Sequence, residues 1–388
     1  MTGIKLLAFN GAPAHLFTNG KNRIYQLFPN EEFDFETNKP DILFFLSGGS
    51  EMEALKYAKS QKNLLLAAFE ENNSYAAATE VKAHFDTIWQ DCQLIDLKNE
   101  TDRQLISDFI LAKKASYWLN GKRLGLIGEV SDWLVASDIS AETLASKTGI
   151  ELVRIPWNEV RDYKDFTPTP DFLKTYKTDG DFNITDAGNV HQALAETIKS
   201  KHLDAITVEC FSLVKQNSVT ACLALSKFND DNIPAGCEGD LASITGIMIA
   251  KEVTGIIPWM ANTVKVDAES AKFAHCTAPT KLLSEFKIDT HYETGLGTSV
   301  KGLFGSNEVT IFRIDSLIEK AFLTWGTIIS RPESKDACRT QIEVKISQNA
   351  AAILKNKPLG NHHLIIPGNQ IQKLKMFCKL KNIRILTE

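Results

Sequence analysis

The sequence lacks the features that mark several classes of protein. Its seven cysteines are scattered, odd in number and never spaced Cys-x-x-Cys, which argues against a disulfide framework or a thiolate zinc site. Acidic residues outnumber basic ones, and a formal charge of -5 offers no electrostatic basis for binding nucleic acid or an anionic membrane. No apolar run approaches the roughly 18 residues that span a bilayer, and no signal segment is recognisable. We therefore expect a cytoplasmic protein.

The pattern that is present predicts an α/β protein of more than one domain. A chain of 388 residues with 44% hydrophobic and 23% charged residues is typical of a soluble globular protein with two or three domains. Short apolar runs alternate with helical stretches up to residue 119, and the same alternation restarts at residue 123. The runs lie at residues 4–10, 42–46 and 63–69, and the expected helices at 51–60, 74–85 and 101–119. Such alternation favours parallel sheets with helices on both faces. We expect two Rossmann-like parallel-sheet domains, at residues 1–119 and 120–265.

The last third of the chain has a different pattern. After residue 262 helical periodicity fades, and short strand-like runs separated by turns predict an antiparallel sheet or small barrel. The expected domain covers residues 266–388 and ends in a helix at 373–380. The strands expected here lie at residues 271–277, 289–293, 308–314, 326–329, 339–346 and 362–366.

Carboxylates gather at the end of the second α/β pattern. Glu238 and Asp240 stand two residues apart in Cys237-Glu-Gly-Asp240, directly before an apolar helical run, and Glu209 ends an earlier strand. Open α/β sheets bind their ligands at such strand ends. An alternative is that Asp240 only caps the following helix.

Histidines accompany these carboxylates in the C-terminal third. His275 lies in an apolar run, and His291 and Glu293 would share one face if residues 289–293 form a strand. His362 and His363 begin another apolar run, where adjacent side chains face opposite sides. A lone histidine in a strand is more often structural than a ligand, so this pattern alone leaves both roles open.

Several of these motifs, in this order, resemble the L-fucose isomerase-like proteins. The resemblance rests on Cys210-Phe211, on Ala221-Cys-Leu-Ala-Leu225, on Cys237-Glu-Gly-Asp240 and on Asn361-His362 followed by a strand and a closing helix. It covers residues 205 to the end and is vague before them. The family comprises manganese-dependent aldose–ketose isomerases that work through a metal-bound enediol, with carboxylates moving the proton between C1 and C2.

The resemblance implies particular roles for residues of this chain. Asp240 matches a metal-ligating carboxylate and His362 the metal-ligating histidine. The family's other metal-binding glutamate falls at Thr220, and Glu209 is the residue that could replace it as a ligand or act in proton transfer. We thus expect Asp240 and Glu209 as catalytic residues, and Asp240, His362 and Glu209 as Mn²⁺ ligands. The expected substrate contacts are Glu238, His275, His291 and Arg339.

The expected function is that of a sugar ketol isomerase, an intramolecular oxidoreductase acting on a small sugar. Family members are oligomers, so a homo-oligomer is also expected. The alternative is a carbohydrate-binding or sensing protein on an isomerase scaffold without catalysis, in which Arg339 and Trp259 would contact the sugar. The sequence does not identify the sugar, because specificity depends on the shape of the pocket.

Overall fold

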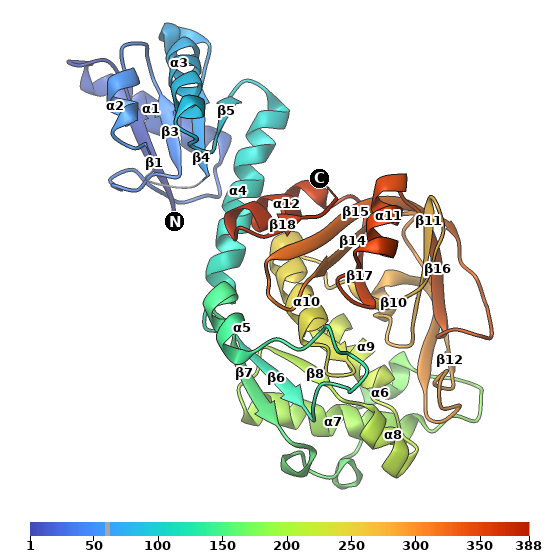
Figure 1. Ribbon diagram of the computed structural model, residues 1–388. Helices are drawn as coiled ribbons and strands as arrows, with labels where there is room; N and C mark the ends of the chain where they lie inside the picture. Colours follow the sequence, from blue (N-terminus) through green and yellow to red (C-terminus); the bar gives the residue numbers. More distant parts are fainter. Residues whose placement is uncertain (59–62, 388) are drawn as a thin grey trace. The chain divides into compact units, whose positions relative to one another are not determined.

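The computed structural model describes residues 1–58 and 63–387 of the chain. It divides them between two compact units, Met1–Lys114 and Ala115–Glu388 (Figure 1). The two α/β domains and the β domain expected from the sequence had boundaries after residues 119 and 265. The second unit contains both a parallel sheet and an antiparallel one, so those boundaries within the chain stay a prediction.

A parallel sheet forms the first unit, as the alternating pattern predicts. Its strand order is β2-β1-β3-β4-β5, and every neighbouring pair is parallel. Three of the strands are the expected apolar runs, and their residues are almost wholly buried. The strands are β1 (Thr2–Leu7), β2 (Phe33–Asp34), β3 (Ile42–Phe45), β4 (Leu64–Ala68) and β5 (Cys92–Asp96).

The helices of this unit differ in length from the expected ones. A helix was expected at residues 51–60, but α2 ends at Leu55, and residues 59 and 60 lie outside the described residues. The expected long helix at 101–119 is present as α4 (Glu100–Leu119). The remaining helices before it are α1 (Ala14–Leu27), α2 (Glu51–Leu55), η1 (Glu71–Asn73) and α3 (Ser74–Thr87).

The second unit begins with another parallel sheet, in the order β7-β6-β8-β9. The strands are β6 (Arg123–Ile127), β7 (Glu151–Ile155), β8 (Ala205–Val208) and β9 (Ala235–Cys237). The helical segments between and after them are α5 (Ala141–Thr148), η2 (Trp157–Glu159), η3 (Tyr163–Asp165), α6 (Pro170–Thr175), α7 (Ile184–Ser200), α8 (Phe211–Asn217), α9 (Cys222–Asp230) and α10 (Leu241–Thr254).

The C-terminal strands close into an antiparallel barrel. The order is β14-β17-β10-β11-β16-β15, and β14 pairs with β15 to complete the ring, while β18 extends it from β15. The expectation of an antiparallel sheet or small barrel is confirmed in outline. The strands of this sheet are β10 (Trp259–Val266), β11 (Ser270–His275), β14 (Glu308–Ile314), β15 (Lys320–Ser330), β16 (Thr340–Lys345), β17 (His362–Pro367) and β18 (Arg384–Ile385).

One expected strand is wrong. Residues 289–293 form no strand beyond Asp289, which ends β12 (Leu283–Asp289) in a hairpin with β13 (Ser299–Phe304). The residues between them form a turn, closed by Gly295 N–H donating to the His291 carbonyl at 2.9 Å. Gly295 and Gly297 have φ of 65° and 60°, a left-handed conformation that glycine tolerates and a strand excludes. His291 and Glu293 therefore do not share a strand face.

Helix α10 is the element that joins the parallel sheet to the barrel (Figure 1). It is apolar on all sides, because one side contacts β8 and β9 and another contacts β14, β17 and α12 (Ile371–Leu380). Asp240 caps its start and Gly255, at φ 74°, ends it. Residues at its N-terminus therefore lie where the sheet's carboxyl end meets the barrel. The other helical segments of this region are η4 (Thr280–Leu282) and α11 (Gln348–Asn356).

No helix within the described residues is long and apolar enough to cross a membrane.

A buried histidine away from the sheet ends makes the stability of the second unit depend on pH. His191 on α7 stacks on Phe228 at 4.4 Å, and its Nε2 has no hydrogen-bond partner in the described structure. Burial lowers the pKa of His191 from 6.5 to about 4. The unfolded chain therefore binds a proton between pH 6.5 and 4 that the folded protein excludes, so stability falls as the pH falls through this window.

We expect the free energy of unfolding to decrease by about 2 kcal/mol between pH 7 and pH 5 through His191. Replacing His191 by phenylalanine keeps a ring on Phe228 and removes the titrating group. Urea unfolding of H191F at pH 7 and pH 5 should give two free energies of unfolding whose difference is smaller by that amount than in the unmodified protein. An unchanged pH difference would contradict this assignment.

Candidate metal centre

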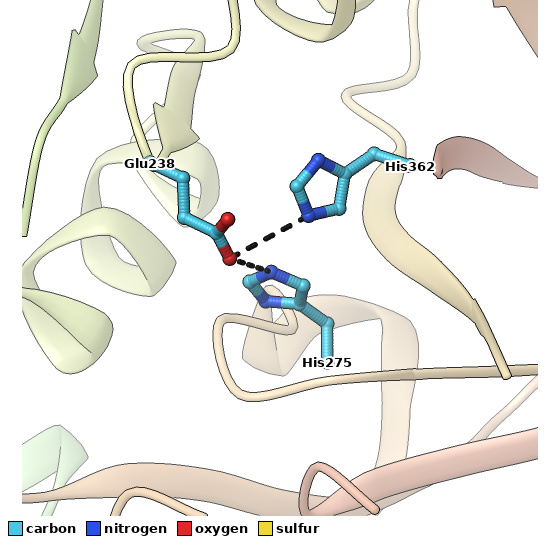
Figure 2. Close-up of side chains that lie close together, drawn as sticks. All are labelled: Glu238, His275 and His362. Atoms are coloured by element: carbon cyan, nitrogen blue, oxygen red, sulfur yellow. Dashed lines mark ion pairs between the residues drawn. The ribbon is translucent and has the colours of Figure 1, made fainter. Parts of the chain in front are cut away.

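Three buried side chains meet at the junction of the parallel sheet and the barrel (Figure 2). Glu238 lies between β9 and α10, His275 ends β11 and His362 begins β17. Glu238 Oε1 is 3.7 Å from His275 Nε2 and 3.6 Å from His362 Nε2. These separations are too long for hydrogen bonds, so the three ligand atoms face a common point without satisfying one another.

The remaining nitrogen of each imidazole is already used. His275 Nδ1 lies 3.0 Å from Thr277 Oγ1, and His362 Nδ1 lies 2.9 Å from Asp240 Oδ2. Both Nε2 atoms are buried and have no hydrogen-bond partner among the described residues. Metal-ligating histidines commonly have one nitrogen held by an outer partner in this way. Two imidazoles and a carboxylate suit a divalent metal such as manganese, iron or zinc, so the residues present fit a metal ion.

The backbone at Glu238 is strained in a way that aims its side chain. Glu238 has φ 61°, which a residue with a side chain rarely adopts, and Gly239 follows at φ 69°. A Cβ at Gly239 would lie 2.3 Å from the carbonyl oxygen of Glu129, so only glycine fits there. Trp133 Nε1 donates to Glu238 Oε2 at 2.7 Å and leaves Oε1 for the cluster. Strain of this kind is concentrated at functional sites.

The charges of the cluster already favour a cation. Burial by itself opposes ionisation of Glu238, but His362 and His275 outweigh it and hold the pKa of this carboxyl well below its usual range. Burial likewise lowers the pKa of His362, yet the Glu238 and Asp240 carboxylates raise that pKa to about 9. A proton is thus held between these carboxylates, in a field that would equally attract a divalent cation.

Asp240 performs two tasks at once. Its Oδ1 accepts from Ser243 N–H at 2.7 Å and so caps α10, while Oδ2 holds His362 Nδ1. Capping and participation in the site, which the sequence left as alternatives, are therefore compatible. Both oxygens of Asp240 are occupied by these partners. Asp240 is therefore not one of the three side chains whose ligand atoms converge. The geometry favours Asp240 as the residue that orients His362, and its ligand role stays a prediction.

Arg313 on β14 supports Asp240 from the barrel side. This arginine is 1% exposed. Its Nη1 donates to the His362 carbonyl at 2.6 Å and to Ser243 Oγ at 3.0 Å, and lies 3.4 Å from Asp240 Oδ2. Its Nη2 donates to Ser137 Oγ at 2.8 Å. Arg313 and His362 hold the pKa of Asp240 well below its usual value despite burial, which favours the neutral acid. The arginine therefore fixes both the charge and the position of Asp240.

The other expected site residues lie around this cluster. Glu209 follows β8, accepts from Ser212 N–H at 3.0 Å and lies 3.4 Å from Trp157 Nε1, outside the three-residue group. Thr220 is buried, and its hydroxyl donates to the carbonyl of Thr298, so it serves the packing of a loop.

His291 lies on the turn after β12, and Arg339, directly before β16, contacts that turn. Arg339 Nε donates to the Thr290 carbonyl at 2.8 Å and so holds this turn. His291 packs edge-on against Phe211 at 5.6 Å, and burial together with the nearby His275 lowers its pKa to about 4. Their expected role as substrate contacts stays a prediction.

The sequence interpretation missed two residues of the site. Arg313 stands in the largely apolar run Val309-Thr-Ile-Phe-Arg-Ile314, and a charge within such a run signals a buried partner. Trp133 is not among the expected site residues, and no sequence signal links it to Glu238, 105 residues away.

Replacing Asp240 by asparagine separates an orienting role from a ligand role. Asparagine keeps the oxygen that caps α10 but no longer fixes His362 with a charge. We expect affinity for Mn²⁺ to fall about 10- to 100-fold while one ion per chain is still bound, as is usual for outer partners of a ligand. Calorimetric titration of metal-free D240N measures this. Complete loss of binding would show that Asp240 is itself a ligand.

Similarity to known proteins is weak. No family model matches the sequence. Sulfoquinovose isomerases from Priestia megaterium (strain ATCC 12872 / QMB1551) and Priestia aryabhattai are each 22% identical over 259 residues, covering 61% of this chain and 57% of those proteins. That from Clostridium sp. (strain MSTE9) is 20% identical over 194 residues, or 46% of this chain and 43% of that protein. The chain thus spans little more than half the length of the two Priestia relatives and less than half that of the Clostridium relative. These weak similarities fit the broad resemblance to sugar isomerases that the sequence motifs carry.

Proposed function

We propose that this protein is a sugar ketol isomerase that interconverts an aldose and a ketose through an enediol, in the L-fucose isomerase-like group. The observation that carries the proposal is the convergence of Glu238, His275 and His362, with two buried imidazole nitrogens that have no hydrogen-bond partner in the described part of the chain. The similarity to sulfoquinovose isomerases supports the same reaction class.

Glu238, His275 and His362 would hold a divalent cation, for which we propose Mn²⁺. When bound, the cation would polarise the sugar carbonyl and its neighbouring hydroxyl, which makes the C–H proton on the hydroxyl-bearing carbon easier to remove. Asp240 orients His362 through Nδ1, and Arg313 holds Asp240. Trp133 fixes Glu238 so that only one of its oxygens faces the two imidazoles.

Proton transfer between C1 and C2 needs a carboxylate that is not fully committed to the metal. Glu209 is our proposed proton-transfer residue, because it follows β8 at the same sheet edge as Glu238, one strand away. Its position among the described residues argues for this role over the ligand role expected from the sequence. Glu209→Gln should then abolish turnover and leave metal binding intact.

The cellular setting is part of the same proposal. We propose a homo-oligomer acting on a small sugar in the cytoplasm, with no nucleic-acid or membrane partner. His291 and Arg339 are proposed as substrate contacts, since His291 lies on the turn beside Phe211 and His275, and Arg339 holds that turn through the Thr290 carbonyl.

The test is a screen of aldoses with Mn²⁺-loaded protein, in which ketose formation is measured and chelation is the control. The proposal predicts that at least one aldose is converted, and that chelation stops the conversion. Binding of a sugar with no ketose formed from any aldose would reject it in favour of a carbohydrate-binding or sensing protein on the same scaffold.

A further inference from the structure

A hollow of about 360 Å³ lies at the carboxyl end of the β7-β6-β8-β9 sheet. The connection after β6 leads to β7 on one side, and the connection after β8 leads to β9 on the other side. The loops after β6 and β8 therefore diverge, and open α/β sheets bind ligands in the crevice that such divergence creates. The hollow lies between those loops, at residues 128–133 and 209–215. Its size is within the usual range for small-molecule sites.

The wall of the hollow combines aromatic faces with polar groups. Trp133, Trp157 and Phe211 line it, and Trp133 packs edge-on against Phe211 at 4.8 Å. Trp157 Nε1 donates to the Glu209 carbonyl at 3.0 Å, so its ring is held in place. Rigid aromatic faces of this kind receive the C–H surfaces of a sugar ring, while a few polar groups fix its orientation.

One polar group of the wall lacks a partner. Ser131 lines the hollow and is 5% exposed, yet its hydroxyl makes no hydrogen bond with any described residue. A buried hydroxyl without a partner costs free energy, and a ligand hydroxyl would recover it only where the loop at residues 128–133 gives way, because the Ser131 oxygen itself has almost no exposed surface.

The charges of the wall disfavour an anion. Glu129, Asp132 and Glu209 line the hollow against a single cation, Lys215. Glu129 is paired with Arg154 at 3.3 Å, whereas Asp132 and Lys215 make no ion pair among the described residues. The net charge of the side chains that line the hollow is therefore negative. A carboxylate or sulfonate placed here would meet like charges, while neutral hydroxyls could donate to these carboxylates.

The hollow also adjoins the metal centre directly. Trp133 donates to Glu238 Oε2, and Ser131 N–H donates to the Glu238 carbonyl at 3.0 Å. The same short loop thus forms part of the wall and holds a candidate metal ligand.

We propose that this hollow binds the hydroxyl-bearing part of a neutral sugar, and that it discriminates against sugars with an anionic group at that end. The inference rests on the proposed isomerase function, because that function says which end of the sugar reacts. The preference for a neutral sugar rests on the hollow alone. It distinguishes this chain from relatives named for a sulfonated sugar.

The binding test uses the full-length Mn²⁺-loaded protein and a panel of neutral aldopentoses and aldohexoses, with D-glucuronate and sulfoquinovose as anionic sugars. Quenching of tryptophan fluorescence reports binding. At least one neutral aldose should bind at least tenfold more tightly than either anionic sugar. Trp157→Ala should weaken that binding about tenfold or more, and Trp157→Phe, which keeps an aromatic face, should recover most of the loss.

Charge reversal tests the selectivity itself. Asp132→Lys should raise affinity for the anionic sugars about tenfold, whereas Asp179→Lys, the same change on an exposed loop outside the hollow, should not. Tighter binding of an anionic sugar by the unmodified protein would overturn the proposal, as would sugar binding that Trp157→Ala and Asp132→Lys leave unaltered.

The two proposals fail separately. Ketose formation with a KM that is insensitive to Trp157→Ala and Asp132→Lys would reject the hollow and leave the isomerase function standing. Neutral-sugar binding that these variants weaken, with no ketose formed from any aldose, would reject the isomerase and retain the hollow.

Discussion

Replacing Glu238 by glutamine is expected to reduce affinity for Mn²⁺ by more than roughly 100-fold, beyond the 10- to 100-fold cost that outer partners of a metal usually carry. The change removes the one carboxylate among the three converging side chains and leaves two neutral imidazoles. Hard cations need such an oxygen ligand and its charge. Metal content after purification and calorimetric titration with Mn²⁺ would both show the loss.

The fold should survive this change, because glutamine keeps the acceptor for Trp133 and the same side-chain length. Glu293→Gln is the matched control. This carboxyl lies on the turn after β12, and burial together with Glu238 raises its pKa, but it is not one of the converging ligands. The affinity of the Glu293→Gln variant for Mn²⁺ should stay within about threefold of that of the unmodified protein. Equal losses in both variants would mean that general charge, not ligation, holds the ion.

Replacing Arg313 by methionine is expected to destabilise the second unit by about 3–5 kcal/mol. Asp240 is wholly buried, and Arg313 is the cation beside it. Removing that cation leaves the buried carboxylate with His362 as its remaining charge partner, and the hydroxyls of Ser137 and Ser243 lose their donor. Urea unfolding monitored by circular dichroism measures the change in the free energy of unfolding.

The double variant with Asp240→Asn shows whether the loss comes from the buried charge. Asparagine is neutral and keeps the cap of α10, so R313M/D240N should be more stable than the sum of the single changes predicts. A strictly additive pair of losses would contradict the assignment and would point to lost packing around the arginine. Arg313→Lys should not restore stability fully, because one ammonium cannot reach all four acceptors.

The sequence predicted the parts of the site that follow from local pattern. The run Cys237-Glu-Gly-Asp240 before an apolar helix placed two carboxylates at a strand end, and both lie at the junction of sheet and barrel. The resemblance paired Asp240 with His362, and their side chains lie 2.9 Å apart although 122 residues separate them. Such a link cannot come from local pattern, because it depends on how the barrel docks on α10.

The division of roles between neighbouring carboxylates was beyond sequence reasoning. Glu238 faces the imidazoles because it adopts a left-handed backbone conformation, which spacing does not reveal. His275 was expected to contact substrate, but the pairing of β11 with β10, which in turn pairs with β17, brings it next to His362. His291 was assigned to a strand because its neighbours Thr290 and Tyr292 are typical of strands, although two glycines that make the turn follow shortly after.

The central claim is that Glu238, His275 and His362 hold a divalent cation. Crystals of the protein soaked in Mn²⁺ and measured near the manganese absorption edge test it most directly. We predict an anomalous-scattering peak within about 2.3 Å of Glu238 Oε1 and of the Nε2 atoms of His275 and His362. A cluster without a peak, or a peak bound instead by Asp132 and Glu209 in the neighbouring hollow, would contradict the account.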